Sequence, residues 1–304
     1  MDIIVHDMLA AQRTILEAPL EERLAICRAR VLEPLRPVWS IFVGRMPQTG
    51  DGGEAAQAEA AARLVGLFNL QADAGDYLTA LERLEQAGAE GAMREALERG
   101  VRAFTDAGRQ LPIEHVAGNL LLGDRDNSYF MDLMRGYTGN GSVPGNVLVT
   151  VWPTDYTLPR IGAATAHEFH HNVRLSYAPW SMDISVGEYI VLEGLAESFA
   201  AALYGHALVG PWVTSLTPDE TERSKAIIGG ALDVRGFRNV QPYLFGDPAS
   251  SMAGYEPLGL PFCAGYTIGF HLVQAYLART GRSIVEATFT PANEIVAEAG
   301  YFES

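Results

Sequence analysis

The sequence predicts an α+β fold, and three observations support this prediction. Four segments in the first third of the chain repeat apolar residues at helical spacing, with Ala, Glu, Arg and Leu between them. Two short apolar or β-branched runs follow, each bounded by Gly, Asp and Pro, which is typical of strands. Further long helical segments come after the predicted sheet.

The helices of the first third are expected at residues 20–42, 54–69, 73–87 and 89–107. Their apolar stripes are interpreted as buried core, because an amphipathic helix normally buries its apolar face. The Gly-rich run at residues 48–53 is the expected linker within this series. The sequence changes character near Gly108, so we expect a helical N-terminal region at residues 1–107 and a second domain at residues 108–304.

The expected strands are residues 113–122 and 146–152. Between them, residues 136–142 contain glycines that permit backbone conformations other residues resist. This run has no Lys-Ser or Lys-Thr ending, so a phosphate-binding loop is not expected. We interpret it as a flexible loop over a cleft.

Composition and charge exclude some classes of partner. The 304 residues are 48% hydrophobic and 19% charged, as in an ordinary folded enzyme, and the net charge of −15 argues against nucleic acid or an anionic membrane surface. Cys27 and Cys263 are too few for a disulfide framework and lack the Cys-x-x-Cys spacing of a thiolate zinc site. Residues 1–7 show no secretory signal, and no stretch reaches about 18 uninterrupted apolar residues. We therefore expect a cytoplasmic protein with no membrane partner.

The pattern His-Glu-x-x-His lies at residues 167–171, within a segment predicted to be a helix. Because a helix turns once in about 3.6 residues, His167 and His171 present two imidazoles on one face, where zinc accepts such a pair. Glu168 lies at the edge of the same face, where its carboxylate can accept a proton from a water that the metal activates. The alternative is a helix with these residues by coincidence and no metal.

A second long helix, expected at residues 184–204, offers the third ligand that a catalytic zinc site needs. Glu193 is interpreted as that ligand and Glu197, one turn further on, as the acid that orients a ligating imidazole, although spacing alone does not separate the two roles. Gly194 is expected to let this helix approach the His-Glu-x-x-His helix closely. The alternative for the two acids is a solvated acidic face.

Three separated motifs together resemble a known family. They are residues 166–171 (Ala-His-Glu-Phe-His-His), residues 192–197 (Leu-Glu-Gly-Leu-Ala-Glu), and residues 264–270 (Ala-Gly-Tyr-Thr-Ile-Gly-Phe) with 273–277. In this order they resemble the bacterial family described as predicted zinc-dependent proteases, which is similar in layout to the gluzincin metallopeptidases. The resemblance spans roughly residues 110–304.

This resemblance implies a zincin-like core: a small sheet, an active-site helix and a mostly helical C-terminal lobe. It implies zinc ligation by His167, His171 and Glu193, with Glu168 as general base. Glu197 matches the acid that gluzincins place one turn after the ligand. The gap between the second His and the Glu is a few residues longer here than in the aminopeptidase branch.

Other polar residues near these motifs are assigned as follows. His170 is interpreted as a packing or supporting residue, since its position after His167 leaves it on the flank of the ligand face. The capping box at Thr217 starts a helix ending near Asp233, and residues 265–278 form another helix. On the latter, Tyr266 or His271 is a candidate donor to the developing oxyanion, with a core role as the alternative, and Tyr255 is a weaker candidate.

The expected function is that of a zinc metallopeptidase acting on a peptide or protein substrate. The strand at residues 146–152 is expected to be the edge that holds an extended peptide. The competing hypothesis is a metal-binding regulatory or interaction protein that keeps the site without turnover. An intact Glu168 argues against it, because a structural zinc needs no base. The sequence predicts no oligomeric state.

Overall fold

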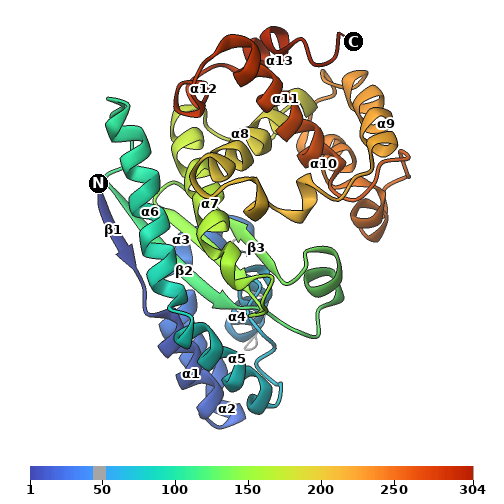
Figure 1. Cartoon of the computed structure of the whole chain (residues 1–304). Coiled ribbons are helices and arrows are strands. Elements are labelled where there is room, and N and C mark those ends of the chain that lie inside the picture. Colours follow the sequence, from blue (N-terminus) through green and yellow to red (C-terminus); the bar gives the residue numbers. More distant parts are fainter. Residues whose placement is uncertain (44–52, 304) are drawn as a thin grey trace. The chain divides into compact units, whose positions relative to one another are not determined.

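A computed structural model describes residues 1–43 and 53–303 (Figure 1). The fold is α+β, as predicted, with many helices and one small mixed sheet. The chain divides into two compact units, of which the first comprises residues 1–101 and 113–172, and the second residues 102–112 and 173–304. This division does not coincide with the expected boundary at residue 107. That residues 1–107 and 108–304 are separate domains stays a prediction.

The sheet belongs to the first unit and has the strand order β1-β2-β4-β3. The two predicted strands are present as β2 (His115–Leu122) and β4 (Asn146–Val151), which pair in parallel with Ala117 opposite Asn146. β1 (Asp2–Val5), which the sequence analysis missed, pairs in parallel with β2. The N-terminal region is therefore not purely helical, because its first residues complete the sheet.

Two expectations about the edge of the sheet are wrong. The Gly-rich segment predicted to be a loop forms β3 (Tyr137–Asn140), antiparallel to β4. As a result β4 is an inner strand with partners on both sides, and β3 takes the edge position that we assigned to residues 146–152. The physical reason is the hairpin: the chain leaves β3, turns through residues 141–145 and returns as β4 with its backbone hydrogen bonds satisfied.

Helices pack against this sheet in the first unit. Met93 and Leu97 of α6 (Ala89–Asp106) lie against Gly118 of β2, so α6 covers one part of the sheet. In α1 (Met8–Glu17), the fully buried Gln12 donates to the carbonyl of Leu120 and accepts from the backbone N–H of Leu122. The helices of this unit are α1 (Met8–Glu17), α2 (Leu20–Cys27), α3 (Arg36–Val43), α4 (Gly53–Leu64), α5 (Ala74–Gln86) and most of α6 (Ala89–Asp106).

The single helix expected at residues 20–42 is interrupted. After α2 the chain forms a π-helical turn (Arg28–Leu32) and a short turn before α3 begins. Pro34 and Pro37 explain the break, because proline lacks the N–H that a helix interior needs. The expected linker at residues 48–53 lies outside the described residues except for Gly53, which begins α4.

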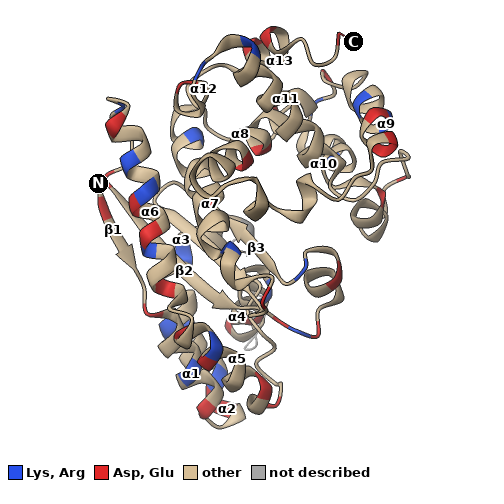
Figure 2. Ribbon diagram, in the orientation of Figure 1, with Lys and Arg blue, Asp and Glu red and all other residues tan. Residues whose placement is uncertain are grey.

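The second unit is helical around one apolar core. Its long buried helices α8 (Val186–Tyr204) and α11 (Ala264–Thr280) cross where Gly194 meets Gly269. They lie so close that a Cβ on either glycine would overlap the backbone of the other helix. Charged residues are spread along α6, whereas α11 is almost free of them, as a buried helix should be (Figure 2). The helices are α8 (Val186–Tyr204), α9 (Pro218–Gly229), α10 (Phe237–Met252, kinked at Gly246), α11 (Ala264–Thr280), α12 (Ile284–Ala287) and α13 (Ala292–Ala299).

The predicted capping box at Thr217 is confirmed, since its side chain and that of Glu220 exchange hydrogen bonds with each other's backbone N–H. The helix ends at Gly229, a few residues earlier than expected. Both cysteines are buried and free, and burial raises the pKa of Cys27 to about 12. Among the described helices, none is both long and apolar enough to cross a membrane.

Candidate metal centre

Helix α7 (Ile161–Tyr177) carries the His-Glu-x-x-His pattern, as predicted. A 3₁₀ turn (Leu158–Arg160) leads into it, and the Thr165 hydroxyl donates to the carbonyl of Ile161. His167 and His171 lie one turn apart and are both at least nine-tenths buried. Their Nε2 atoms are 3.0 Å apart, so the two imidazoles point at one place.

Glu193 of α8 completes a set of three metal donors. One ligand atom from each of His167, His171 and Glu193 lies within 4.8 Å of the other two, and all three residues are buried. Two imidazole nitrogens and one carboxylate oxygen are a donor set of catalytic zinc sites, which leave the fourth position open. A buried carboxylate beside two imidazoles is costly to desolvate unless a cation neutralises it. The residues present therefore fit a zinc ion.

The helix that carries Glu193 is fixed at its start and along its length. Ser185 and Glu188 form a capping box at its N-terminus, and nearly every residue of α8 up to Ala201 is buried. The expectation for Gly194 was wrong about its neighbour: Gly194 packs on Gly269 of α11. Glu193 precedes this contact, so the crossing of α8 and α11 holds the position of its backbone.

Glu168 lies directly beneath the edge strand β3. A Cβ built on Gly139 would overlap its carboxylate, and one built on Gly141 would overlap its backbone carbonyl. Neither glycine was assigned a role from the sequence. The available signal was their spacing, because residues two apart in a strand share a face and glycine in a strand marks a close approach.

Asn172 joins α7 to the β3–β4 hairpin, and the sequence analysis missed this role as well. Its amide donates to the carbonyls of Gly141 (2.7 Å) and Asn146 (2.8 Å) and accepts from the N–H of Gly145 (2.7 Å). Asn172 is fully buried. Since all of these partners are backbone groups distant in sequence, no local pattern marks the residue. Asn172 directly follows His171, so the hairpin is anchored beside a metal donor.

Glu197 is buried one turn after Glu193, on the same helix. One carboxylate oxygen accepts from the N–H of Gly210 at 2.5 Å and the other from Nε1 of Trp212 at 3.1 Å. Thr267 of α11 donates to the carbonyl of Trp212, which ties this segment to a third element. Glu197 thus holds the segment after α8 in place. Its expected hydrogen bond to a ligating imidazole stays a prediction.

The remaining candidates lie outside the three-residue donor set. Tyr266 is half-buried, with its ring 6.0 Å from that of Phe245 and 6.4 Å from that of Trp212. Burial lowers the pKa of His271, which favours a neutral imidazole. Roles of Tyr266 and His271 at the oxyanion stay predictions.

His170 and Tyr255 also lie outside that set. His170 is fully buried on α7, and Tyr255 donates its hydroxyl to Gln241 at 3.3 Å. The packing role expected for His170 is consistent with its burial.

The comparisons with known proteins bear on this centre. The model of the family described as Predicted Zn-dependent protease matches residues 89–297. The chain belongs to this family. It is 31% identical over the full length of both chains to the uncharacterized protein YjfC of Bacillus subtilis (strain 168). It is also 28% identical to the uncharacterized protein YjaZ of the same organism over 46% of this chain and 51% of that protein. No solved structure matches.

Proposed function

We propose that the protein is a zinc-dependent metallopeptidase that cleaves peptide bonds with Glu168 as general base. The observation that carries this proposal is the buried set of His167, His171 and Glu193, with Glu168 next to the first histidine. The description of the family supports the same activity. A purely structural zinc site would need neither an open fourth position nor an adjacent base.

In this proposal each residue of the centre has a separate task. His167 and His171 supply two neutral nitrogens and Glu193 one anionic oxygen. Zinc held by them would act as a Lewis acid, lowering the pKa of water and polarising the scissile carbonyl. Glu168 accepts the proton of the attacking water and passes it to the leaving amine. Because it directly follows His167, it would lie near a metal held there without being one of the three donors.

The edge strand β3 is the proposed binding site for an extended substrate backbone. Within the sheet of the described residues, β3 pairs with β4 on one side only. An unpaired strand edge offers N–H and C=O groups to which a peptide can add as a further strand. Because Gly139 and Gly141 of this segment pack on Glu168, a peptide added to β3 would lie close to the general base.

The test uses purified protein loaded with zinc and a diverse mixture of synthetic peptides, with products identified by mass spectrometry. Cleavage that is lost with a chelator and restored by zinc is the expected result. Glu168→Gln should reduce it at least about 100-fold while metal content stays at the parent level, because the amide cannot accept a proton. Equal cleavage by parent and Glu168→Gln would contradict the proposed base. A protein that binds zinc and cleaves no peptide would support the regulatory alternative instead.

A further inference from the structure

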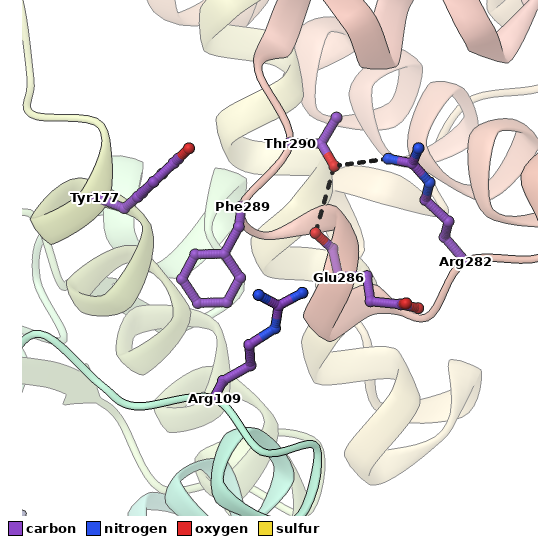
Figure 3. A pocket seen from close by; sticks show the side chains of 6 residues that line it. All are labelled: Arg109, Tyr177, Arg282, Glu286, Phe289 and Thr290. Atoms are coloured by element: carbon purple, nitrogen blue, oxygen red, sulfur yellow. Dashed lines mark hydrogen bonds between the residues drawn. The ribbon is translucent and has the colours of Figure 1, made fainter.

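A pocket of about 560 Å³ lies in the second unit and is separate from the donor set described above. Its volume is within the range of roughly 300–1,000 Å³ that small-molecule sites occupy. The end of α7, the segment after α6, and α12 with the residues on either side of it contribute to its walls (Figure 3). The lining residues are Arg109, Tyr177, Arg282, Glu286, Phe289 and Thr290.

One wall of the pocket is aromatic. The ring of Tyr177 meets that of Phe289 edge-on at 5.5 Å, and Phe104 meets Phe289 edge-on from within the protein at 6.0 Å. The guanidinium of Arg109 lies 5.2 Å from the centre of the Phe289 ring. Tyr177 remains 51% exposed, which is unusual for a large ring packed on a cluster. This wall presents apolar surface with a cation beside it.

Two arginines in the pocket lack the ion pairs that several other arginines of the chain make. Arg13 and Arg235, for example, each have a carboxylate oxygen within 3.0 Å. Across residues 1–43 and 53–303, neither Arg109 nor Arg282 has a carboxylate within 4.0 Å. Two such guanidinium groups in one pocket stand out in a chain with a net charge of −15. They form a local positive site in an acidic protein.

Hydrogen bonds to two side-chain hydroxyls hold the guanidinium of Arg282 in position. Its Nη1 donates to the hydroxyl of Tyr276 at 2.9 Å and to Thr290 Oγ1 at 3.3 Å. The buried Arg174 of α7 donates to the backbone carbonyl of Thr290 and so also holds Thr290 in place. The site is therefore largely preformed, which reduces the ordering cost of binding.

The negative charge of Glu286 offsets part of the positive charge of the two arginines in the pocket. Its carboxylate accepts from both the N–H and the hydroxyl of Ser283, each at 2.8 Å. These hydrogen bonds, followed by the charges of Arg109 and Arg282, lower the pKa of Glu286, so it is ionised at neutral pH. Two positive groups and one negative group leave a single positive charge. That balance suits a ligand with one negative charge.

We propose that this pocket binds a small organic carboxylate that carries an apolar ring or chain. The carboxylate lies between Arg109 and Arg282, and the apolar part packs against Tyr177 and Phe289. Guanidinium groups match carboxylates in shape and charge, and aromatic walls retain apolar groups. The proposal does not depend on the peptidase activity, since none of its residues belongs to the metal centre.

The probes are 3-phenylpropionate, the neutral 3-phenyl-1-propanol and acetate, measured by isothermal titration calorimetry on the intact protein. Saturable binding of 3-phenylpropionate is expected in roughly the millimolar range, at least about tenfold tighter than either of the others. Arg109→Gln removes one of the two proposed carboxylate-binding groups and should weaken binding of 3-phenylpropionate at least about fivefold. Arg13→Gln is the matched control, because it removes a partly exposed arginine of the first unit, and it should bind like the parent.

Three results would overturn the proposal. They are no saturable binding of 3-phenylpropionate up to about 20 mM, equally tight binding of the alcohol, and unchanged affinity in Arg109→Gln. The last result would place the carboxylate elsewhere, for example on a metal held by the three donors. Tyr177→Ala provides a second check on the apolar wall and should also weaken binding.

Discussion

Gly139 of the edge strand lies directly against the carboxylate of Glu168. A Cβ added at Gly139 would overlap Oε1 and come within 2.5 Å of Cγ, so the absence of a side chain at this position makes the space for the Glu168 carboxylate. The strand proposed to bind substrate is therefore in direct contact with the residue proposed to accept the proton. A change on β3 acts on Glu168 without touching a metal donor.

Gly139→Ala tests this relationship. The new methyl group must displace the Glu168 carboxylate, and a shift of about 1 Å at a catalytic group can cost about 100-fold in rate. We expect a loss of that order in peptide cleavage with unchanged zinc content. Gly91→Ala is the control, because the same methyl there meets nothing within 4 Å. Full activity in Gly139→Ala would show that Glu168 does not need its present position.

Asn172→Ala removes three buried hydrogen bonds between α7 and the β3–β4 hairpin. The carbonyls of Gly141 and Asn146 and the N–H of Gly145 would lose their partner on α7. We expect the free energy of unfolding to fall by about 1–3 kcal/mol or more, because buried polar groups lose their partner. Urea denaturation measures this change. A loss below about 0.5 kcal/mol would mean that the hairpin does not depend on Asn172.

Glu193 and Glu197 are expected to respond differently to substitution, although they lie one turn apart. Glu193→Ala should purify largely without zinc, because it removes one of three donors. In Glu197→Gln, the new amide faces the N–H of Gly210 and Nε1 of Trp212 with only one acceptor oxygen. We expect zinc to be retained and the free energy of unfolding to fall by about 1–3 kcal/mol. Zinc lost in Glu197→Gln and kept in Glu193→Ala would reverse the assignment.

Gly269→Ala tests the crossing of α8 and α11. The added Cβ would overlap the carbonyl oxygen of Ile190, so the helices must separate or shift. We expect a loss of about 1–3 kcal/mol in the free energy of unfolding, as for other overpacked positions. Thermal unfolding monitored by circular dichroism measures it, with Gly91→Ala again as control. An unchanged midpoint would show that the crossing tolerates a methyl group.

Local patterns predicted much of the fold and of the site. The spacing of His167 and His171 follows from helical geometry alone, and the capping box at Thr217 is a signal confined to four residues. The strands β2 and β4 were found because their apolar runs are long enough to stand out. Glu193 was predicted on a different ground, that a catalytic zinc needs a third ligand, and it lies in the buried cluster with the two histidines.

What the sequence missed depends on contacts between distant segments. β1 has four residues, and Asp2 pairs with His115, more than a hundred positions away, so no local pattern marks it. The edge position assigned to residues 146–152 was wrong because the Gly-rich segment before them, which was expected to be a loop, forms β3 and pairs with β4. Gly194 was correctly read as a close approach, but its partner is Gly269. Spacing identifies a face of a helix, and only tertiary packing decides what covers it.

Zinc content is the most direct test of the metal centre. The protein is purified without added metal, exchanged into zinc-containing buffer, freed of excess metal and analysed by inductively coupled plasma mass spectrometry. The account predicts about one zinc per chain in the parent protein and in Glu168→Gln, and far less in His167→Ala and Glu193→Ala. A parent protein that retains no zinc, or His167→Ala and Glu193→Ala variants that retain as much as the parent, would contradict it.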